Sequence, residues 1–263
     1  MFKLYVLLMY LFLSCVSTVG ISQRRVKQDN RVDGISITSS IGMGSVVGEL
    51  GNIFCPKPIY GLNIDRGVSE KVNIGVSILG GNLFGSEEKP YFSVFKTDYF
   101  QVQTLAILNI SRYFLTSYNR NMFELKFYGG VGMIWFHTDV FDLKSGVFLR
   151  ATSENASKHT ALFQPTGNGI GEAGIYYTRE LMVPFGFKID YKISENTFLN
   201  FDMGYNWINN DKLDGTTPHN ILNPNNISGI NSYSNTPNDG WVNLSLGLRY
   251  TFSFDRTRNQ RGV

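Results

Sequence analysis

His137 is the residue of this 263-residue chain whose surroundings most readily suggest catalysis. Asp139, Asp142 and Ser145 follow it within one short stretch. A serine, a histidine and a carboxylate are the groups that a hydrolase with a serine nucleophile requires. No motif marks a serine as the nucleophile, and nearness in sequence does not establish hydrogen-bonded geometry. We therefore expect no enzymatic activity from this cluster.

The remaining candidates for chemistry are isolated. His159 and His219 lie in polar stretches without a second histidine or cysteine at the spacing of metal ligands. The glycines from Gly167 to Gly171 have no strand before them and no helix after them, which a phosphate-binding loop would need. The sequence thus predicts no metal site and no cofactor.

The first twenty residues have the layout of a secretory signal peptide. Lys3 is followed by an apolar run from Leu4 to Leu13 and then by small residues, which predicts cleavage after Gly20. In an alternative reading, the segment is a lipoprotein signal in which Cys15 would be acylated. Cleavage after Gly20 leaves Cys55 as the one cysteine, so no internal disulfide is expected.

The composition of the chain indicates one strand-rich domain. Charged residues make up only 17% of the sequence, whereas aromatic residues make up 14% and glycines number 27. Basic residues cluster only in the predicted linker, residues 21–33, at Arg24, Arg25, Lys27 and Arg31. Such a patch is typical of a solvated linker, so nucleic-acid binding is not expected.

Alternation with a period of two recurs along the rest of the chain. The stretch PFGFKIDYKISENTFLNFDMGYNWI, residues 184–208, places large apolar side chains on one face of two runs and small or charged ones on the other. This period predicts β-strands, and the polar residues between the runs predict a hairpin. Eight strands are expected in total: Gly34 to Glu49, Ile59 to Arg66, Val72 to Leu83, Tyr99 to Leu115, Met122 to Phe141, Pro184 to Ile193, Thr197 to Ile208, and Trp241 to Phe254.

The connections between these strands alternate in length. Three are predicted to be tight turns: Gly67 to Lys71, Thr116 to Asn121, and Ser194 to Asn196. The others are longer: Leu50 to Pro58, Phe84 to Asp98, Asp142 to Val183, and Asn209 to Gly240. Short turns at one end and long loops at the other are typical of transmembrane barrels of the bacterial outer membrane, with the short turns in the periplasm.

The chemistry of the two strand faces supports the same fold. Large aromatic residues near strand ends fit the interfacial girdles of a membrane barrel. Glycine, serine and asparagine fill the opposite face, as a narrow eight-stranded lumen requires. Charges of both signs share that face and should pair with one another inside the lumen. This predicted polar network consists of Asp65, Glu124, Lys126, Lys188, Asp190, Lys192, Asp202 and Arg249.

Three stretches resemble the outer-membrane β-barrel proteins of the Bacteroidota, whose architecture is similar to the eight-stranded OmpA/OmpX type. They are PIYGLNIDRGVSEKVNIGVSI, FKIDYKISENTFLNFDMGYNWI and DGWVNLSLGLRYTFSF, and the resemblance covers residues 33–254. It implies an aromatic final strand, here with Tyr250, Phe252 and Phe254, that the barrel insertion machinery reads. This chain differs by continuing with a polar tail, and a peptidoglycan-binding domain after the barrel is not expected.

Together these observations predict an all-β protein with one eight-stranded antiparallel up-and-down transmembrane barrel in the bacterial outer membrane. A signal peptide (1–20) and a periplasmic linker (21–33) would precede the barrel (34–254), and a polar tail (255–263) would follow it. The expected partners are outer-membrane lipid, the insertion machinery and another envelope or surface partner bound through loops 142–183 and 209–240. Its expected role is structural or surface interaction. Two alternatives are a small outer-membrane hydrolase that acts on lipid and a secreted soluble barrel that carries a ligand.

Overall fold

The computed structural model describes residues 34–48, 50, 55–69, 71–88, 92–111, 122–152, 163–164, 178–209, 212–215 and 238–252. The expected signal peptide, N-terminal linker and C-terminal tail lie outside the described residues. Within the described ranges, no helix is long and apolar enough to cross a membrane.

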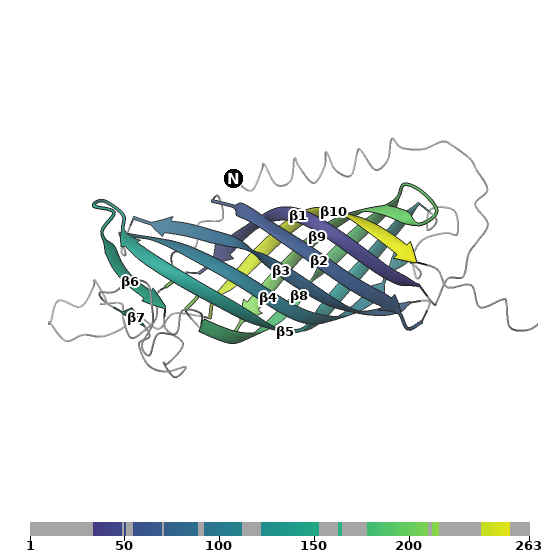
Figure 1. Ribbon diagram of the computed structural model, residues 1–263, viewed down its shortest axis with the longest axis horizontal. Coiled ribbons are helices and arrows are strands. Elements are labelled where there is room, and N and C mark those ends of the chain that lie inside the picture. Colours follow the sequence, from purple (N-terminus) through teal and green to yellow (C-terminus); the bar gives the residue numbers. More distant parts are fainter. Residues whose placement is uncertain are drawn as a thin grey trace, which may run out of the picture.

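Eight long strands form one sheet that closes on itself (Figure 1). Each pairs antiparallel with its neighbours in the chain, β5 pairs with β8, and β1 with β10 closes the circle. The expected closed eight-stranded antiparallel barrel is therefore confirmed. Its strands are β1 (Ile35–Val47), β2 (Lys57–Gly67), β3 (Val72–Glu87), β4 (Ser93–Asn109), β5 (Phe123–Asp142), β8 (Thr178–Lys192), β9 (Thr197–Ile208) and β10 (Gly240–Phe252).

The register of the strands fixes the geometry of the barrel. Starting at Trp135 of β5, the paired residues lead through Phe100 of β4 and around the sheet to Leu125, again on β5. The circuit therefore returns ten residues away, since 135 minus 125 is 10. For eight strands, this stagger corresponds to a strand tilt of about 40° and a radius of about 8 Å. A barrel of that radius can be filled by its own side chains.

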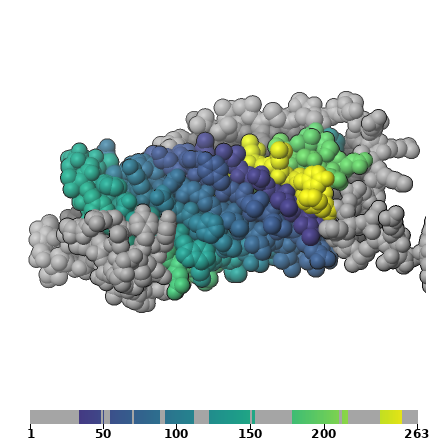
Figure 2. Space-filling view, in the orientation of Figure 1, coloured from purple at the N-terminus to yellow at the C-terminus, as the bar shows by residue number. Residues whose placement is uncertain are grey.

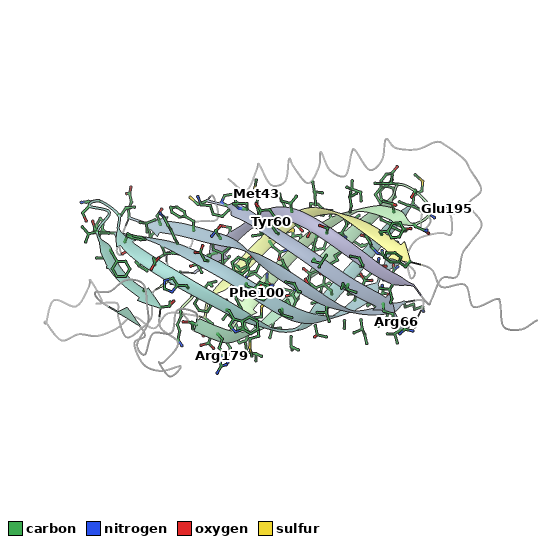
Figure 3. All side chains as sticks on the ribbon, viewed as in Figure 1. Met43, Tyr60, Arg66, Phe100, Arg179 and Glu195 are labelled. Atoms are coloured by element: carbon green, nitrogen blue, oxygen red, sulfur yellow. The ribbon has the colours of Figure 1, made fainter. Side chains whose placement is uncertain are left out.

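Two faces of opposite chemistry result from the two-residue period. On β10, for example, Leu244, Leu246 and Leu248 are exposed on the outside, whereas Asn243 and Ser245 between them are buried inside. Side chains of Met43, Tyr60 and Phe100 likewise project outward (Figure 3). On the side seen in Figure 2, the side chains of β1 to β5 form a continuous wall.

One predicted long loop is wrong. Residues 84–98 mostly continue the β3–β4 hairpin, whose pairing extends to Glu87 and Ser93. The outward Asn82, Lys96 and Asp98 have the polarity of a loop, but Leu83 and Phe95 on the opposite face are buried in the interior. The inward side chains of β3 and β4 thus remain apolar and packed where their outward side chains are already polar. This packing keeps both segments in strand conformation.

Other strand boundaries differ from the prediction as well. β8 begins at Thr178, ahead of the expected Pro184, and β4 ends at Asn109, where Ile110 turns to donate its amide to the Leu125 carbonyl. Two short strands, β6 (Phe148–Thr152) and β7 (Phe163–Gln164), lie within the expected loop 142–183 and extend the sheet from β5.

Two of the three predicted tight turns are confirmed. Backbone bonds close residues 68–72 and 193–197. The third, residues 116–121, falls outside the described residues.

Candidate functional site

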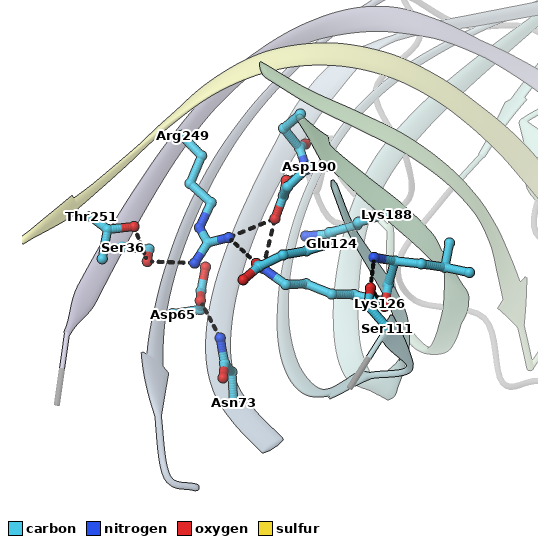
Figure 4. A network of polar contacts seen from close by, with 12 residues as sticks. Ser36, Asp65, Asn73, Ser111, Glu124, Lys126, Lys188, Asp190, Arg249 and Thr251 are labelled. Carbon is cyan, nitrogen blue, oxygen red and sulfur yellow. Dashed lines mark hydrogen bonds and ion pairs between the residues drawn. The ribbon is translucent and has the colours of Figure 1, made fainter. Parts of the chain in front are cut away.

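Several charged side chains lie inside the barrel, and a network of ion pairs occupies the half of the interior nearer the short turns. Lys126 of β5 places its ammonium nitrogen 2.6 Å from a carboxylate oxygen of Asp190 on β8 and 2.7 Å from one of Glu124. A guanidinium nitrogen of Arg249 on β10 lies 2.6 Å from the same oxygen of Asp190 and 3.1 Å from Glu124 (Figure 4). Two cations and two carboxylates thus satisfy one another where water is scarce, as buried charges require.

Neutral side chains complete the hydrogen bonding of this network. Asn200 donates its amide to the second carboxylate oxygen of Asp190 at 2.6 Å. Arg249 also donates to the Ser36 hydroxyl at 3.1 Å, which in turn lies 3.0 Å from the Thr251 hydroxyl. These contacts connect β8 with β9 and β10 with β1, and they hold the guanidinium group in one orientation.

A second ion pair lies deeper in the barrel. The ammonium group of Lys188 is 3.5 Å from Asp202 and 5.1 Å from the centre of the Tyr128 ring. Tyr128 donates its hydroxyl to Asp202 at 2.9 Å. Gly186 and Gly204 leave room for this hydroxyl, since a Cβ at either position would lie less than 3 Å from it.

The other two predicted network residues occupy the margins. Asp65 is buried and accepts the Asn73 amide at 2.9 Å, and no ion pair joins it to another described residue. Lys192 is half-buried at the end of β8, and within the described ranges no ion pair links it to the other predicted network residues. The structure therefore joins Glu124, Lys126, Asp190 and Arg249, and separately Lys188 and Asp202.

A polar pocket of about 60 Å³ opens beside the four-residue network. Two of its lining groups, Arg249 Nε and Asn109 Oδ1, are buried without a hydrogen-bond partner among the described residues. The volume suffices for a few water molecules, which could pair both groups. Its lining residues are Gly34, Ser36, Gly67, Ser69, Asn73, Asn109, Glu124, Lys126, Arg249 and Thr251.

The half of the interior nearer the long loops is mainly apolar, which the alternating sequence pattern did not predict. Phe95, Ile134, Phe136 and Trp241 are fully buried there, and the ring of Tyr99 packs at a tilt against that of Trp241, with 4.9 Å between ring centres. The two-residue period could have indicated that these side chains point into the barrel, because each lies on the same strand face as residues that were predicted to point inward. The full cluster is Val46, Leu50, Ile59, Leu79, Leu83, Phe95, Tyr99, Ile134, Phe136, Val140, Met182, Ile208, Leu213 and Trp241.

A short piece of the last long loop, residues 212–215, closes this apolar half. The side chain of Leu213 is fully buried, and its carbonyl accepts the hydroxyls of Thr97 and Thr138 at 2.8 and 2.9 Å. Asp239 accepts the Leu213 amide at 2.7 Å. We call residues 212–215 the mouth segment.

Both ends of the mouth segment are also fixed to the barrel. Lys212 pairs with Glu180 of β8 at 3.1 Å, and Asp214 accepts the backbone amide of Leu50 at 2.8 Å. Gly215 has φ of +80°, a conformation that favours glycine.

The residues that were considered and rejected as a catalytic cluster form no serine–histidine–carboxylate chain of hydrogen bonds among the described residues. His137 lies 3.1 Å from Asp139, but the hydroxyl of Ser145 donates to Asp142 at 2.7 Å instead. Hydrogen bonds from the amide and hydroxyl of Ser145 lower the pKa of Asp142 below its ordinary value and stabilise a turn. His159, His219 and the glycines 167–171 lie outside the described residues, and so does Cys15. Cys55 is half-buried with a free thiol.

No family model matches the chain, and no curated protein matches it either. The expected relation to the Bacteroidota barrels therefore has no support from sequence comparison.

Several solved structures have a similar fold. Neisserial surface protein A is 13% identical and has a TM-score of 0.44, with 83% of this chain and 97% of that chain covered. Ail of Yersinia pestis is 12% identical with a TM-score of 0.42 and covers 84% and 99%. OprG from Pseudomonas aeruginosa is 12% identical with a TM-score of 0.41 and covers 87% and 100%. At these values the comparison adds no functional argument, and the fold rests on the strand pairing itself.

Proposed function

We propose that the protein is a bacterial outer-membrane barrel with a sealed interior, which serves as a structural or surface-interaction component. The observation that carries the proposal is a belt of exposed apolar side chains around the whole barrel. Its members come from all eight strands and include Ile41, Tyr60, Val76, Phe100, Val131, Phe185, Met203 and Leu246. A water-soluble protein rarely exposes a contiguous apolar surface of this extent.

The height of the belt suits an outer membrane. On β5, every outward residue from Leu125 to Trp135 is apolar or glycine. At the tilt of about 40°, ten residues of strand rise by about 25 Å along the barrel axis, which is the height of the apolar band in outer-membrane barrels. Tyr250 and Phe252 lie at its lower edge, where an aromatic girdle and the final-strand signal of the insertion machinery are expected.

The interior supports a role without ion conduction. Ion pairs fill the half nearer the short turns, and thirteen buried apolar residues pack in the other half together with Leu213 of the mouth segment. An ion would have to displace fully buried side chains such as Trp241 and Phe136. This arrangement favours a structural role or recognition from outside over passage of solutes.

The arrangement of the ends supports an orientation. The start of β1 and the end of β10 lie at the same end of the barrel as the confirmed short turns. In the proposed orientation this end faces the periplasm, and loops 142–183 and 209–240 face outward, where they contact an envelope or surface partner. The Bacteroidota lineage remains a prediction.

Refolding the chain from urea tests the proposal in two steps. In phosphatidylcholine vesicles, but not in plain buffer, the chain should reach a form whose gel mobility changes on boiling. A folded monomer in buffer without lipid or detergent would contradict membrane insertion. In planar bilayers the folded protein should show no current steps, and steady conductance would contradict the sealed interior alone.

A further inference from the structure

Outward-facing ionisable side chains gather on one wall of the barrel, directly beyond the apolar belt. They lie on β4, β5 and β8, where strands continue past the belt. We call this set the charged patch: Lys96, Asp98, Asp139 and Arg179. Figure 3 shows Arg179 on this wall, far from Arg66 and Glu195 near the short turns.

The register gives the height of the patch above the belt. Trp135 of β5 pairs with Phe100 of β4 on one side and with Arg179 of β8 on the other. The rings of Trp135 and Phe100 lie 6.1 Å apart. Height along the axis changes by about 2.5 Å per residue and by about 3 Å per strand at this tilt. Arg179 therefore lies about 3 Å and Lys96 about 7 Å beyond Trp135, whose ring is of the kind found at membrane interfaces.

In a membrane that covers the apolar belt, the charged patch would lie at the level of the lipid headgroups. Only some of the strands extend to this level. β1 ends at Val47, β9 at Ile208, and β10 begins at Gly240, all near the level of Trp135. Along the described parts of these three strands, no outward charged side chain follows the belt. The patch is therefore a local feature and not a general property of the barrel rim.

The side chains of the patch suit phosphate chemistry. Lys96 and Arg179 are exposed, and the ammonium group of Lys96 lies 5.5 Å from the centre of the Phe141 ring. Asp98 accepts a hydrogen bond from Asn82, and Asp139 lies 3.1 Å from His137. Cations bind phosphate directly, and carboxylates share divalent cations with it.

We propose that the charged patch binds phosphorylated headgroups of outer-leaflet lipid together with divalent cations, an inference that rests on the proposed membrane location. Lys96 and Arg179 contact phosphate oxygens of neighbouring lipids. Asp98 and Asp139 take part through bridging divalent cations. The lipid on this wall is thereby held more firmly than on the others.

The test compares vesicles of phosphatidylcholine alone with vesicles that also contain lipid A, a glycolipid with two phosphates, in the presence of magnesium. The temperature at which the folded gel mobility is lost is measured for the parent, for Lys96→Gln/Arg179→Gln and for Arg66→Gln. Arg66 is an exposed outward cation at the opposite rim and serves as the matched control. Folding of all three in phosphatidylcholine alone is the reference.

Lipid A should raise the transition temperature of the parent and of Arg66→Gln, and most of this rise should be absent in the double variant. Chelation of magnesium should reduce the rise in the parent but not in Asp98→Asn/Asp139→Asn. An equal rise in the parent and the double variant, or no rise in a parent that folds normally, would overturn the proposal. Failure to fold in phosphatidylcholine would instead contradict the membrane location.

Discussion

Asp190 is the residue on which the buried network depends most. Its carboxylate accepts from Lys126, Arg249 and Asn200, each at 2.6 Å. Asp202, by comparison, lies 3.5 Å from its one cation, Lys188. Removing the charge of Asp190 leaves Glu124 as the one carboxylate, among the described residues, that forms ion pairs with the two buried cations.

We therefore expect Asp190→Asn to lower the free energy of unfolding by about 3 kcal/mol or more, in the range seen when a buried ion pair loses one partner. Asp202→Asn should cost clearly less, because it affects only one ion pair and that pair is longer. Urea titration of the protein in vesicles, followed by gel mobility, compares the two. Equal costs would mean that the four-residue network contributes little to stability.

The lipid-facing residues of β9 allow a second test at the residue scale. Met203 is 41% exposed on the outside, directly next to the buried Asp202. A lysine near the bilayer midplane costs about 2 to 4 kcal/mol in a membrane barrel. Met203→Lys should therefore impair refolding into vesicles, whereas Met203→Leu, the control, should refold like the parent. Normal refolding of Met203→Lys would show that this face of β9 is not in lipid.

The alternation of side chains along each strand predicted which charged residues point inward, but not which of them form ion pairs with one another. Lys126 and Asp190 lie on β5 and β8, and Arg249 comes from β10. Their contact depends on the ten-residue stagger of the closed sheet, which no local pattern specifies. The apolar half of the interior was missed for another reason. At Leu83–Phe84, Tyr99–Phe100 and Trp135–Phe136 both faces of the strand are apolar, so the alternation disappears.

At the scale of elements, one seam of the barrel is incomplete. The β5–β8 ladder pairs Gly129 with Phe185 and Gly132 with Met182 in one register, but the two pairs between them are missing. Pro184 lies in this gap and has no amide hydrogen to donate. The interruption lies in the apolar belt, where no water can replace the lost bond.

Pro184→Val should therefore stabilise the barrel by about 1 kcal/mol, the net contribution of one added hydrogen bond. Pro58→Val is the matched control, because Pro58 is exposed near the start of β2. The urea midpoint in vesicles measures both variants. A lower midpoint for Pro184→Val would show that the proline is required by local packing and is not a defect of the ladder.

The strands themselves were largely predictable, because an outer face in lipid and a filled lumen require apolar and small or polar residues to alternate along most of each membrane-spanning strand. The prediction failed where the strands leave the belt. The outward residues Lys96 and Asp98 are polar, as loop residues are. Phe95 and Thr97 alternate with them and are buried inside, which keeps β4 extended. Sequence patterns of transmembrane strands describe only the part of a strand that lies in the membrane, whereas β4 continues beyond it.

For the whole molecule, the unequal strand lengths make the outer end of the barrel slope. β3, β4 and β5 extend to Glu87, Ser93 and Asp142, where the amide of Leu143 donates to the carbonyl of Phe92 and joins the two hairpin tips. The opposite wall, β1 with β9 and β10, is shorter. The protein thus presents a raised side and a low side to anything that approaches from outside.

The pairing of β1 with β10, from Ile35 and Phe252 to Val47 and Gly240, has a consequence for chain connectivity. Barrel closure depends on hydrogen bonds between these strands and not on where the covalent chain is cut. A circular permutant that links residue 252 to residue 34 and opens at the turn 194–196 should refold into vesicles with the same heat-dependent mobility. Its failure to do so would show that the β8–β9 hairpin must form early, as a covalent unit, before the sheet can close.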